Sequence, residues 1–304
     1  MILTAGKIRR NERPLVRFAF ITDSHYAPHI APVPGDRRRY GDALVKMRRF
    51  ALHANRLHAD FAIEGGDFKD LGRTREESFA YLDSIENAFS LFRGPRYHVL
   101  GNHDHDNLTK KEFLSRISNA GQASARAFYS FDVNGVRFIV LDSCYRPDGA
   151  PYCRGDFDWR GAYLPPEQVA FLREALAAAQ GPCVPILHHQ LDAEDDTRVA
   201  NADEVRRVIE ASGKVRCIVQ GHLHEGAWRE LGGIAYFTSP ASVFDDAGVS
   251  EAHSLIEVFA SGAVRIRLFH GILKSVPLSP FPLMFSRRIL TRPLERLRPA
   301  ISSR

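Results

Sequence analysis

The sequence predicts a layered α/β fold, and two patterns support this prediction. In the first hundred residues, short apolar runs alternate with segments whose apolar residues recur at helical spacing. The order is strand, helix, strand, helix, strand with short links, which favours parallel strands with helices packed on them. After residue 128 hairpin signals replace this order, so the second half is expected to mix helices with antiparallel strands.

The individual elements follow from local patterns. Strands are expected at apolar runs, and helices where apolar residues lie three or four positions apart. Asn134-Gly135 is the turn of an expected hairpin, and glycines at 232–233 and 261–262 mark two more. The expected strands are 15–22, 60–64, 96–100, 128–133, 136–142, 184–188 and 215–220, and the expected helices are 40–58, 75–92, 168–179 and 203–212.

Five short polar blocks follow five of these apolar runs. Because open α/β sheets bind their ligands at the carboxyl ends of the strands, the blocks are expected to meet at one edge. Carboxylates, imidazoles and an amide oxygen suit divalent metal ions, so the sequence predicts a two-metal centre that cleaves phosphate esters. The blocks are Asp23-Ser-His25, Gly66-Asp67, Gly101-Asn-His-Asp104, His188-His189 and Gly221-His-Leu-His224.

Composition is that of an ordinary globular protein. The 304 residues are 44% hydrophobic and 25% charged, and no apolar stretch is long enough to span a bilayer. No apolar segment follows the basic residues of the first 17 positions, so no secretory signal is expected. The four cysteines show no metal-binding spacing, which favours a reducing, cytoplasmic location, with a Cys144–Cys153 disulfide as the alternative.

Basic charge is concentrated at the end of the chain. Residues 265–304 contain nine of the 41 Lys and Arg residues but only one acidic residue. We therefore expect a catalytic domain at 1–270 and a basic Pro/Arg-rich tail at 271–304, and no specific binding of nucleic acid. Apolar and basic residues alternate in 281–304, so the tail is expected to contact an anionic membrane surface, its own domain or a partner chain.

In their order, each after a strand, the five blocks resemble the pattern of the calcineurin-like metallophosphoesterases, D-x-H, G-D, G-N-H-[D/E], H and G-H-x-H. The resemblance spans roughly 15–270 and implies a four-layer αββα sandwich of two mixed β-sheets flanked by helices. It also implies two divalent metal ions, for which Mn, Fe, Zn and Co are all compatible. The implied ligands are Asp23, His25 and His224 for one ion and Asn102, His188 and His222 for the other, with Asp67 bridging.

The resemblance also implies a mechanism. A metal-bound hydroxide would attack phosphorus, while His103, oriented by Asp104, stabilises the transition state or protonates the leaving oxygen. The alternative is that His103 and Asp104 only support their loop. His188 is expected to be the ligand because the first histidine binds in relatives with His-His-Pro, although Gln190 replaces the proline here. His189 would then stand behind the ligands or face the substrate.

Further residues beside the metal blocks are candidate substrate contacts. Arg38 and Tyr40 belong to an Arg-Arg-Arg-Tyr run, which could bind phosphate or could simply begin a solvated helix. Tyr26 could stack on a nucleobase or be an ordinary loop aromatic. His105 extends the metal loop toward the expected mouth of the site, and His189 is the fifth candidate.

The expected activity is hydrolysis of a phosphodiester or pyrophosphate bond in a nucleotide-type or other small phosphorylated substrate. The chain is similar to cyclic-nucleotide phosphodiesterases in the D-x-H opening and the His-His block. It is similar to Mn-dependent ADP-ribose/CDP-alcohol diphosphatases in Arg-Arg-Arg-Tyr and in residues 66–72 and 161–176. Purple acid phosphatases are disfavoured because Asp70 stands where they carry tyrosine. The alternative function is a non-catalytic scaffold of the same fold that binds protein partners.

Overall fold

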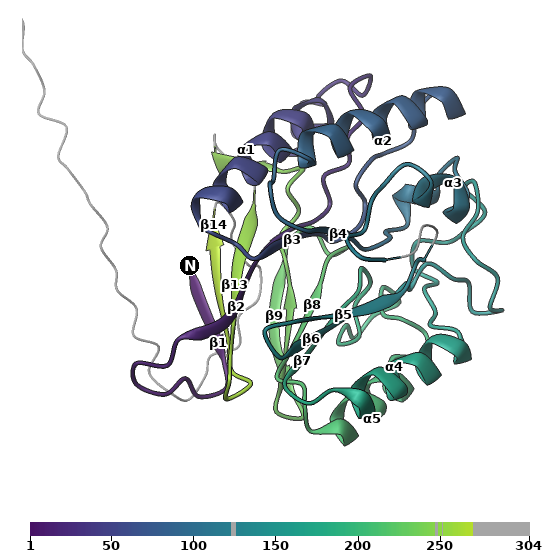
Figure 1. Ribbon diagram of the computed structural model, residues 1–304. Coiled ribbons are helices and arrows are strands. Elements are labelled where there is room, and N and C mark those ends of the chain that lie inside the picture. Colours follow the sequence, from purple (N-terminus) through teal and green to yellow (C-terminus); the bar gives the residue numbers. More distant parts are fainter. Residues whose placement is uncertain (123–125, 247–248, 251, 270–304) are drawn as a thin grey trace, which may run out of the picture.

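The computed structural model describes residues 1–122, 126–246, 249–250 and 252–269. Two six-stranded sheets pack face to face, with helices on both outer sides (Figure 1). The helices are η1 Tyr40–Asp42, α1 Ala43–Arg56, α2 Arg75–Phe89, η2 His103–His105, α3 Lys110–Leu114, α4 Pro166–Ala178 and α5 Ala202–Ser212. The strands are β1 Ile2–Ala5, β2 Pro14–Ile21, β3 Phe61–Glu64, β4 Arg96–His98, β5 Tyr129–Val133, β6 Val136–Val140, β7 Cys183–Ile186, β8 Cys217–Gln220, β9 Ala227–Leu231, β10 Ile234–Thr238, β11 Asp245–Asp246, β12 Val249–Ser250, β13 His253–Phe259 and β14 Val264–Phe269.

Both sheets are mixed, as the resemblance implies. The first has the order β1-β14-β13-β2-β3-β4, and β2, β3 and β4 run parallel. The second has the order β5-β6-β7-β8-β10-β9, with β6, β7, β8 and β10 parallel and antiparallel strands at both edges. The parallel strands end at one edge of the sandwich, and this edge carries the polar blocks.

Three apolar clusters hold the four layers together. One lies between the sheets, where Phe18 of β2 stacks on Phe61 at 5.1 Å and meets Phe138 of the other sheet at 5.3 Å. A second joins the first sheet to α1 and α2, and a third joins the second sheet to α4 and α5. In α1 the buried residues include Met47 and Ala51, which have the predicted helical spacing. The αββα sandwich expected from the resemblance is therefore confirmed.

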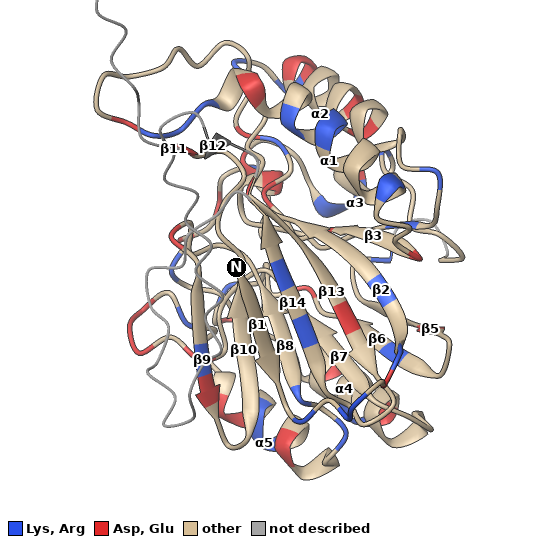
Figure 2. Cartoon of the chain, turned by 90° about the vertical axis from the view of Figure 1, so that its left-hand side faces the viewer, with Lys and Arg blue, Asp and Glu red and all other residues tan. Residues whose placement is uncertain are grey.

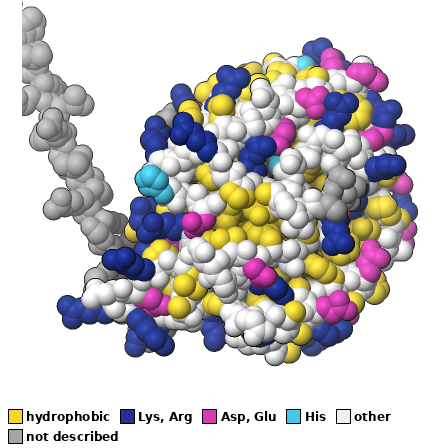
Figure 3. All heavy atoms as spheres, viewed as in Figure 1, with side chains coloured by type: hydrophobic (Ala, Val, Ile, Leu, Met, Phe, Trp, Pro, Cys, Tyr) yellow, Lys and Arg dark blue, Asp and Glu magenta, His cyan; other side chains and the backbone are white. Residues whose placement is uncertain are grey.

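Aromatic contacts join the two sheets along the side of the sandwich where the edge strands β4 and β5 lie. Hydrophobic side chains gather near the middle of the face seen in Figure 3, over the region where the edge strands β4 and β5 lie in Figure 1. Tyr97 of β4 stacks on Phe131 of β5 with ring centroids 3.8 Å apart. This contact ties the last strand of one sheet to the first strand of the other.

Three charged residues on neighbouring strands of the first sheet form two ion pairs. Figure 2 shows basic residues on β2 and β14 and an acidic residue on β13 between them. Glu257 of β13 accepts from Arg17 Nε at 3.1 Å and from Arg265 Nε at 2.6 Å. Burial raises the pKa of Glu257, but its hydrogen bonds and charge interactions with the two arginines outweigh burial, so its pKa lies below the usual value. The two ion pairs therefore tie three neighbouring strands through one buried carboxylate.

Several elements differ from the sequence prediction. The expected helix at 40–58 is a short η1 turn followed by α1, and the strand β1 and the five-residue α3 were not expected. The three predicted hairpins are present as β5–β6, β9–β10 and β13–β14. All four cysteines are free, so the Cys144–Cys153 disulfide alternative is wrong.

The basic tail expected at 271–304 lies outside the described residues. Its contact with a membrane, its own domain or a partner chain therefore remains a prediction, and so does the boundary at residue 270. In the part of the chain that the structure describes, no helix combines the length and the apolar character needed to cross a bilayer.

Candidate metal centre

The parallel strands bring the five polar blocks together at one edge of the sandwich. Asp23, Asp67 and Asn102 follow β2, β3 and β4, while His188 and His222 follow β7 and β8 of the other sheet. Backbone hydrogen bonds tie these loops to one another. The amide of Asp23 donates to the carbonyl of Gly66 at 3.0 Å, and the amide of Gly221 donates to the carbonyl of His188 at 3.0 Å. The geometry is therefore fixed by the loop backbones as well as by the side chains.

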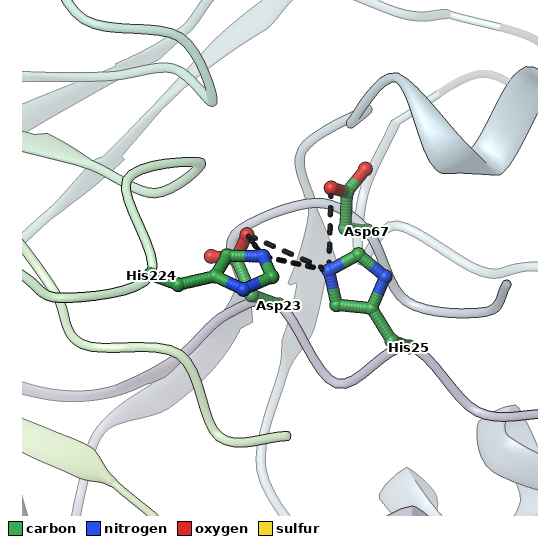
Figure 4. Close-up of side chains that lie close together, drawn as sticks. All are labelled: Asp23, His25, Asp67 and His224. Atoms are coloured by element: carbon green, nitrogen blue, oxygen red, sulfur yellow. Dashed lines mark hydrogen bonds and ion pairs between the residues drawn. The ribbon is translucent and has the colours of Figure 1, made fainter. Parts of the chain in front are cut away.

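The first group of side chains contains Asp23, His25, Asp67 and His224, which point toward one another in Figure 4. The Nε2 atoms of His25 and His224 are 3.0 Å apart, and His224 Nε2 is 3.4 Å from Asp23 Oδ1. One ligand atom from each of the four residues lies within 4.8 Å of the others. This is a compact set of two carboxylates and two imidazoles.

A second group shares Asp67 with the first and adds His188 and His222. Asp67 Oδ2 is 3.5 Å from His25 Nε2 in the first group and 3.3 Å from His188 Nε2 in the second. Asp67 Oδ1 accepts instead from the backbone amide of His103 at 2.8 Å. One oxygen of Asp67 is thus anchored, and the other faces both groups, which is the arrangement that a bridging ligand requires.

Unpartnered polar atoms at the centre fit a pair of cations. Asp23 Oδ1, Asn102 Oδ1, His188 Nε2 and His222 Nε2 are buried and have no hydrogen-bond partner among the described residues. Leaving such atoms unpaired costs free energy, so a native fold rarely buries several together without a ligand. Oxygen and imidazole donors in this number match divalent metals of the first transition row. The donor set therefore fits two such ions.

In His25 and His188, the Nδ1 atom, which faces away from the cluster, has a polar partner elsewhere in the protein. His25 Nδ1 lies 2.9 Å from Asp70 Oδ2, and His188 Nδ1 lies 2.9 Å from the Gly65 carbonyl oxygen. Both contacts aim Nε2 at the cluster. Metal-binding histidines commonly have such a carboxylate or carbonyl partner, because it orients the ring and selects the tautomer.

The backbone is strained at the same residues. Asp23, His25, Asp67 and His222 all have positive φ, between 49° and 66°. Non-glycine residues rarely adopt this left-handed conformation, and strain of this kind gathers at functional sites. Gly101 supports the arrangement, because a Cβ there would lie 2.2 Å from the Asp67 nitrogen. The fold thus accepts strain and excludes a side chain in order to hold these ligand candidates.

The charges of the cluster interact strongly. Burial raises the pKa of Asp23, but the close approach of His224, whose Nε2 is 3.4 Å from Oδ1, and the charge of His188 outweigh burial and lower the pKa to about 2. Burial lowers the pKa of His188, but Asp67 and Asp23 raise it to about 9. The carboxylates therefore create a negative centre that favours positive charge among them.

His103 has a different partner from the one expected. Its Nδ1 pairs with Asp106 Oδ2 at 3.0 Å, not with Asp104. Asp104 is fully buried, and its carboxylate accepts from the backbone amides of Gly101 at 2.9 Å and Phe68 at 3.0 Å. Burial lowers the pKa of His103, but Asp67, Asp106 and Asp70 raise it to about 10. The expected orientation of His103 by Asp104 is therefore wrong, and Asp104 supports the loop.

Two of the candidate substrate contacts lie in the interior instead. Tyr26 is 7% exposed and packs on Tyr81 at 5.6 Å in the cluster beneath α1 and α2, because the loop after β2 folds back under these helices. His105 is fully buried, with its ring 6.5 Å from that of Tyr152. The expectations that Tyr26 stacks on a base and that His105 extends toward the mouth are therefore wrong.

His189 was expected either behind the ligand candidates or facing the substrate, and it lies behind them. Its side chain is fully buried, and its Nδ1 lies 2.8 Å from Ser143 Oγ. Its ring packs against that of His222 with centroids 4.4 Å apart. In this position it supports the ring of His222.

Arg38 and Tyr40 lie beside the cluster. Tyr40 is half-buried, with its ring 6.2 Å from that of His25. The Arg38 guanidinium donates three hydrogen bonds to the Asp36 carboxylate, and Arg38 and His224 both line a groove of about 480 Å³. Phe244 lines the same groove. This groove gives a substrate bound at the cluster room to extend beyond the metals.

Sequence reasoning missed the roles that three residues have in this region. Asp70 and Asp106 orient His25 and His103, and Trp159 stands beside the cluster. Asp70 lies in the Gly-Asp-x-x-Asp-x-Gly stretch, so its spacing from Asp67 was a usable signal. For the other two the sequence holds no distinctive pattern.

Comparison with known proteins agrees with this geometry. The profile of the calcineurin-like phosphoesterase family matches residues 16–226. In structure, the chain is similar to a dimetal phosphatase from Danio rerio, with a TM-score of 0.70 and 20% identity over 81% of this chain and 94% of that one. At this identity the likeness concerns the fold alone.

Relatives that are similar in sequence include the following two proteins. A manganese-dependent ADP-ribose/CDP-alcohol diphosphatase of Oryza sativa subsp. japonica is 32% identical over 148 residues, 47% of this chain and 46% of that protein, so the match spans less than half of the rice protein. A probable cyclic nucleotide phosphodiesterase of Rhodopseudomonas palustris is 28% identical over 229 residues, which cover 71% and 75%. With the family profile covering most of the sandwich, the chain belongs to the calcineurin-like phosphoesterases.

Proposed function

We propose that this chain is a dinuclear-metal-dependent hydrolase that cleaves a phosphodiester or pyrophosphate bond in a nucleotide-type or other small phosphorylated substrate. The observation that carries the proposal is the pair of buried Asp/His groups that share Asp67. The relatives support the substrate class, because one is named for a diphosphatase activity and another for a cyclic nucleotide phosphodiesterase activity.

The proposed ligands follow the two groups of side chains. Asp23, His25 and His224 would hold one divalent ion, and Asn102, His188 and His222 the other, with Asp67 between them. Two such ions supply Lewis acidity at phosphorus and a water whose pKa is lowered toward neutrality. Manganese, iron, zinc and cobalt all accept this mixed oxygen and nitrogen shell.

His103 is the proposed acid and transition-state stabiliser. Its Nδ1 is occupied by Asp106, so Nε2 is the atom that would hold the proton for the leaving oxygen. The side chain is 38% exposed and its ring lies 4.8 Å from that of His25, so it can reach a substrate at the cluster. Asp106 positions the ring in this account, and Asp104 holds the loop.

The groove beside His224 is the proposed place for part of the substrate beyond the reacting phosphate. Arg38 and Arg37 line it together with Phe244. Arg37 packs over the Phe244 ring at 4.1 Å and pairs with Glu225 at 2.8 Å. Arginine favours phosphate oxygens, so a second phosphate is the group that this side suits best.

The test is hydrolysis by Mn²⁺-reconstituted protein. Bis(p-nitrophenyl) phosphate serves as a general substrate, and the panel contains cyclic nucleotides, ADP-ribose, CDP-alcohols, glycerophosphodiesters and UDP-sugar or lipid pyrophosphates. We expect chelator-sensitive turnover, and a fall in kcat of about 10²- to 10⁴-fold in His103→Ala, because that is the usual contribution of a general acid. His58→Ala is the matched control, because His58 is exposed and belongs to neither Asp/His group.

Two results would contradict the proposal. If no substrate in the panel were hydrolysed by metal-loaded protein, the non-catalytic scaffold alternative would replace it. If His103→Ala retained wild-type turnover, the assigned role of His103 would be refuted while the metal-dependent reaction remained.

A further inference from the structure

A tryptophan lies at the rim of the metal centre, next to His222. The ring centroids of Trp159 and His222 are 5.7 Å apart, with the ring planes tilted by 54°. Trp159 keeps 42% of its surface exposed, whereas the other tryptophan, Trp228, is 6% exposed and belongs to the core between the sheets. A large aromatic surface is thus open to solvent within reach of the proposed reaction site.

The loop that carries Trp159 is anchored on both sides of it. Tyr152 is buried, stacks on Phe157 at 4.6 Å, and donates through its hydroxyl to the Asp158 carbonyl at 3.2 Å. The Gly161 amide donates to the same carbonyl at 2.9 Å. Trp159 therefore sits in a turn whose neighbours are fixed, and a ring held in this way loses little conformational entropy when a ligand stacks on it.

Positive charge accompanies the ring. The Arg160 guanidinium lies over Trp159 at 4.3 Å from the centroid, and its Nε is 3.5 Å from Asp196 Oδ2. Aromatic rings bind bases by stacking, and an adjacent arginine adds attraction for the base or for phosphate oxygens. An exposed indole next to a guanidinium is suited to a nucleotide rather than to a purely aliphatic group.

A comparable pair stands on the opposite side of the cluster. Phe244 lies 5.3 Å from the ring of His224, and Arg37 packs over it. The two aromatic–arginine pairs thus flank the centre, one beside His224 and one beside His222. Phe244 is half-buried, so Trp159 offers the more exposed ring.

We propose that Trp159, together with Arg160, is the platform on which an aromatic base of the substrate stacks, on the His222 side of the metal centre. This inference rests on the proposed function, because it concerns the substrate bound at that centre. It assigns base recognition to Trp159 and leaves the groove at Arg37 and Arg38 for the rest of the molecule.

The test compares two ligands that share a phosphate and differ in the base. Adenosine 5′-monophosphate and ribose 5-phosphate are titrated into Mn²⁺-loaded protein, with affinity measured by calorimetry and tryptophan emission recorded in parallel. The variants are Trp159→Ala, which removes the ring, and Trp159→Phe, which keeps an aromatic surface. Trp159→Phe retains only the buried Trp228 as a tryptophan emitter. The change in emission that wild type shows and Trp159→Phe lacks is therefore the response of Trp159.

We expect adenosine monophosphate to quench wild-type emission and Trp159→Phe to lose this signal while retaining most of the affinity. Trp159→Ala should weaken the affinity for adenosine monophosphate about 5- to 150-fold, the usual range for loss of base stacking, and leave the affinity for ribose 5-phosphate unchanged. A purely structural role would weaken both ligands equally, and this result would overturn the proposal.

The outcomes separate this inference from the proposed function. If adenosine monophosphate leaves the emission unchanged, or binds Trp159→Ala as tightly as wild type, the platform is refuted even if the protein hydrolyses phosphoesters. If the emission responds as expected but no substrate is hydrolysed, the platform stands and the proposed reaction fails.

Discussion

Replacing Gly101 by alanine is expected to disable the metal centre while leaving most of the fold intact. Gly101 follows β4, and an added Cβ would lie 2.2 Å from the backbone nitrogen of Asp67 and 2.3 Å from its Oδ1. Neither neighbour can move freely, because Asp67 Oδ1 is held by the His103 amide and Asp67 has positive φ. The substitution therefore acts on the proposed bridging ligand directly.

The size of the effect follows from the contact distance. An ordinary contact begins at 3.4 Å, so one of the two backbones must move by roughly 1 Å, and a displacement of about 1 Å at a reacting group can cost about 100-fold in rate. Forcing a methyl group into a packed interior also costs about 1–3 kcal/mol of stability. We expect Gly101→Ala to lose most Mn²⁺ affinity and at least about 100-fold in turnover, and to melt at a lower temperature.

The assay combines calorimetric Mn²⁺ titration, hydrolysis of bis(p-nitrophenyl) phosphate and thermal denaturation. Gly41→Ala is the matched control, because a Cβ at Gly41 meets nothing within 4 Å. The control should match wild type in all three measurements. Wild-type Mn²⁺ affinity and turnover in folded Gly101→Ala would refute the reasoning, because the geometry leaves no room for the added methyl group.

Three further predictions concern other parts of the molecule. Asp70→Asn should weaken Mn²⁺ binding about 10- to 100-fold in calorimetry, because Asp70 orients the His25 ring; unchanged affinity would contradict this role. Glu257→Gln should destabilise the fold near neutral pH. Because the pKa of Glu257 is lowered in the folded protein, its contribution to the free energy of unfolding is complete above its unfolded pKa of about 4.3 and is lost as pH falls through the lower folded value. Denaturation curves of variant and wild type should therefore converge in acid. A difference that stays constant with pH would contradict the pairing with Arg265. Lys46→Met should lower the free energy of unfolding by about 1–3 kcal/mol in urea titrations, because the buried ammonium donates to three loop carbonyls; an unchanged midpoint would count against this.

Much of the fold and of the site could be predicted from the sequence. The central strands are short apolar runs with helical segments between them, and a polar block at the end of each run has only one edge of the sheet to occupy. The blocks that contain the seven proposed ligands follow from this pattern, whereas the assignment of each ligand follows from the resemblance to the metallophosphoesterases. The structure brings six of the seven together in two groups joined at Asp67, and Asn102 Oδ1 is buried without a hydrogen-bond partner among the described residues. Their ligand roles remain predictions until metal binding is measured.

The remaining features depend on tertiary contacts that leave no local pattern. Strand β1 pairs with β14 across most of the chain, so nothing near β1 in the sequence signals its partner. Asp104 and Asp106 both stand close to His103 in sequence, and only the η2 turn decides which carboxylate reaches the ring. Trp159 lies in an irregular loop, where one aromatic residue does not show whether it faces the core or the site.

The most direct test of the account is the number of metal ions that the protein binds. Calorimetry and elemental analysis after reconstitution should find two Mn²⁺ per chain in wild type. Asp67→Asn, which keeps the size of the side chain but removes its charge and one of its two oxygens, should lose the paired sites together. Two equally tight ions in Asp67→Asn, or one ion or none in wild type, would contradict a dinuclear centre bridged by this residue.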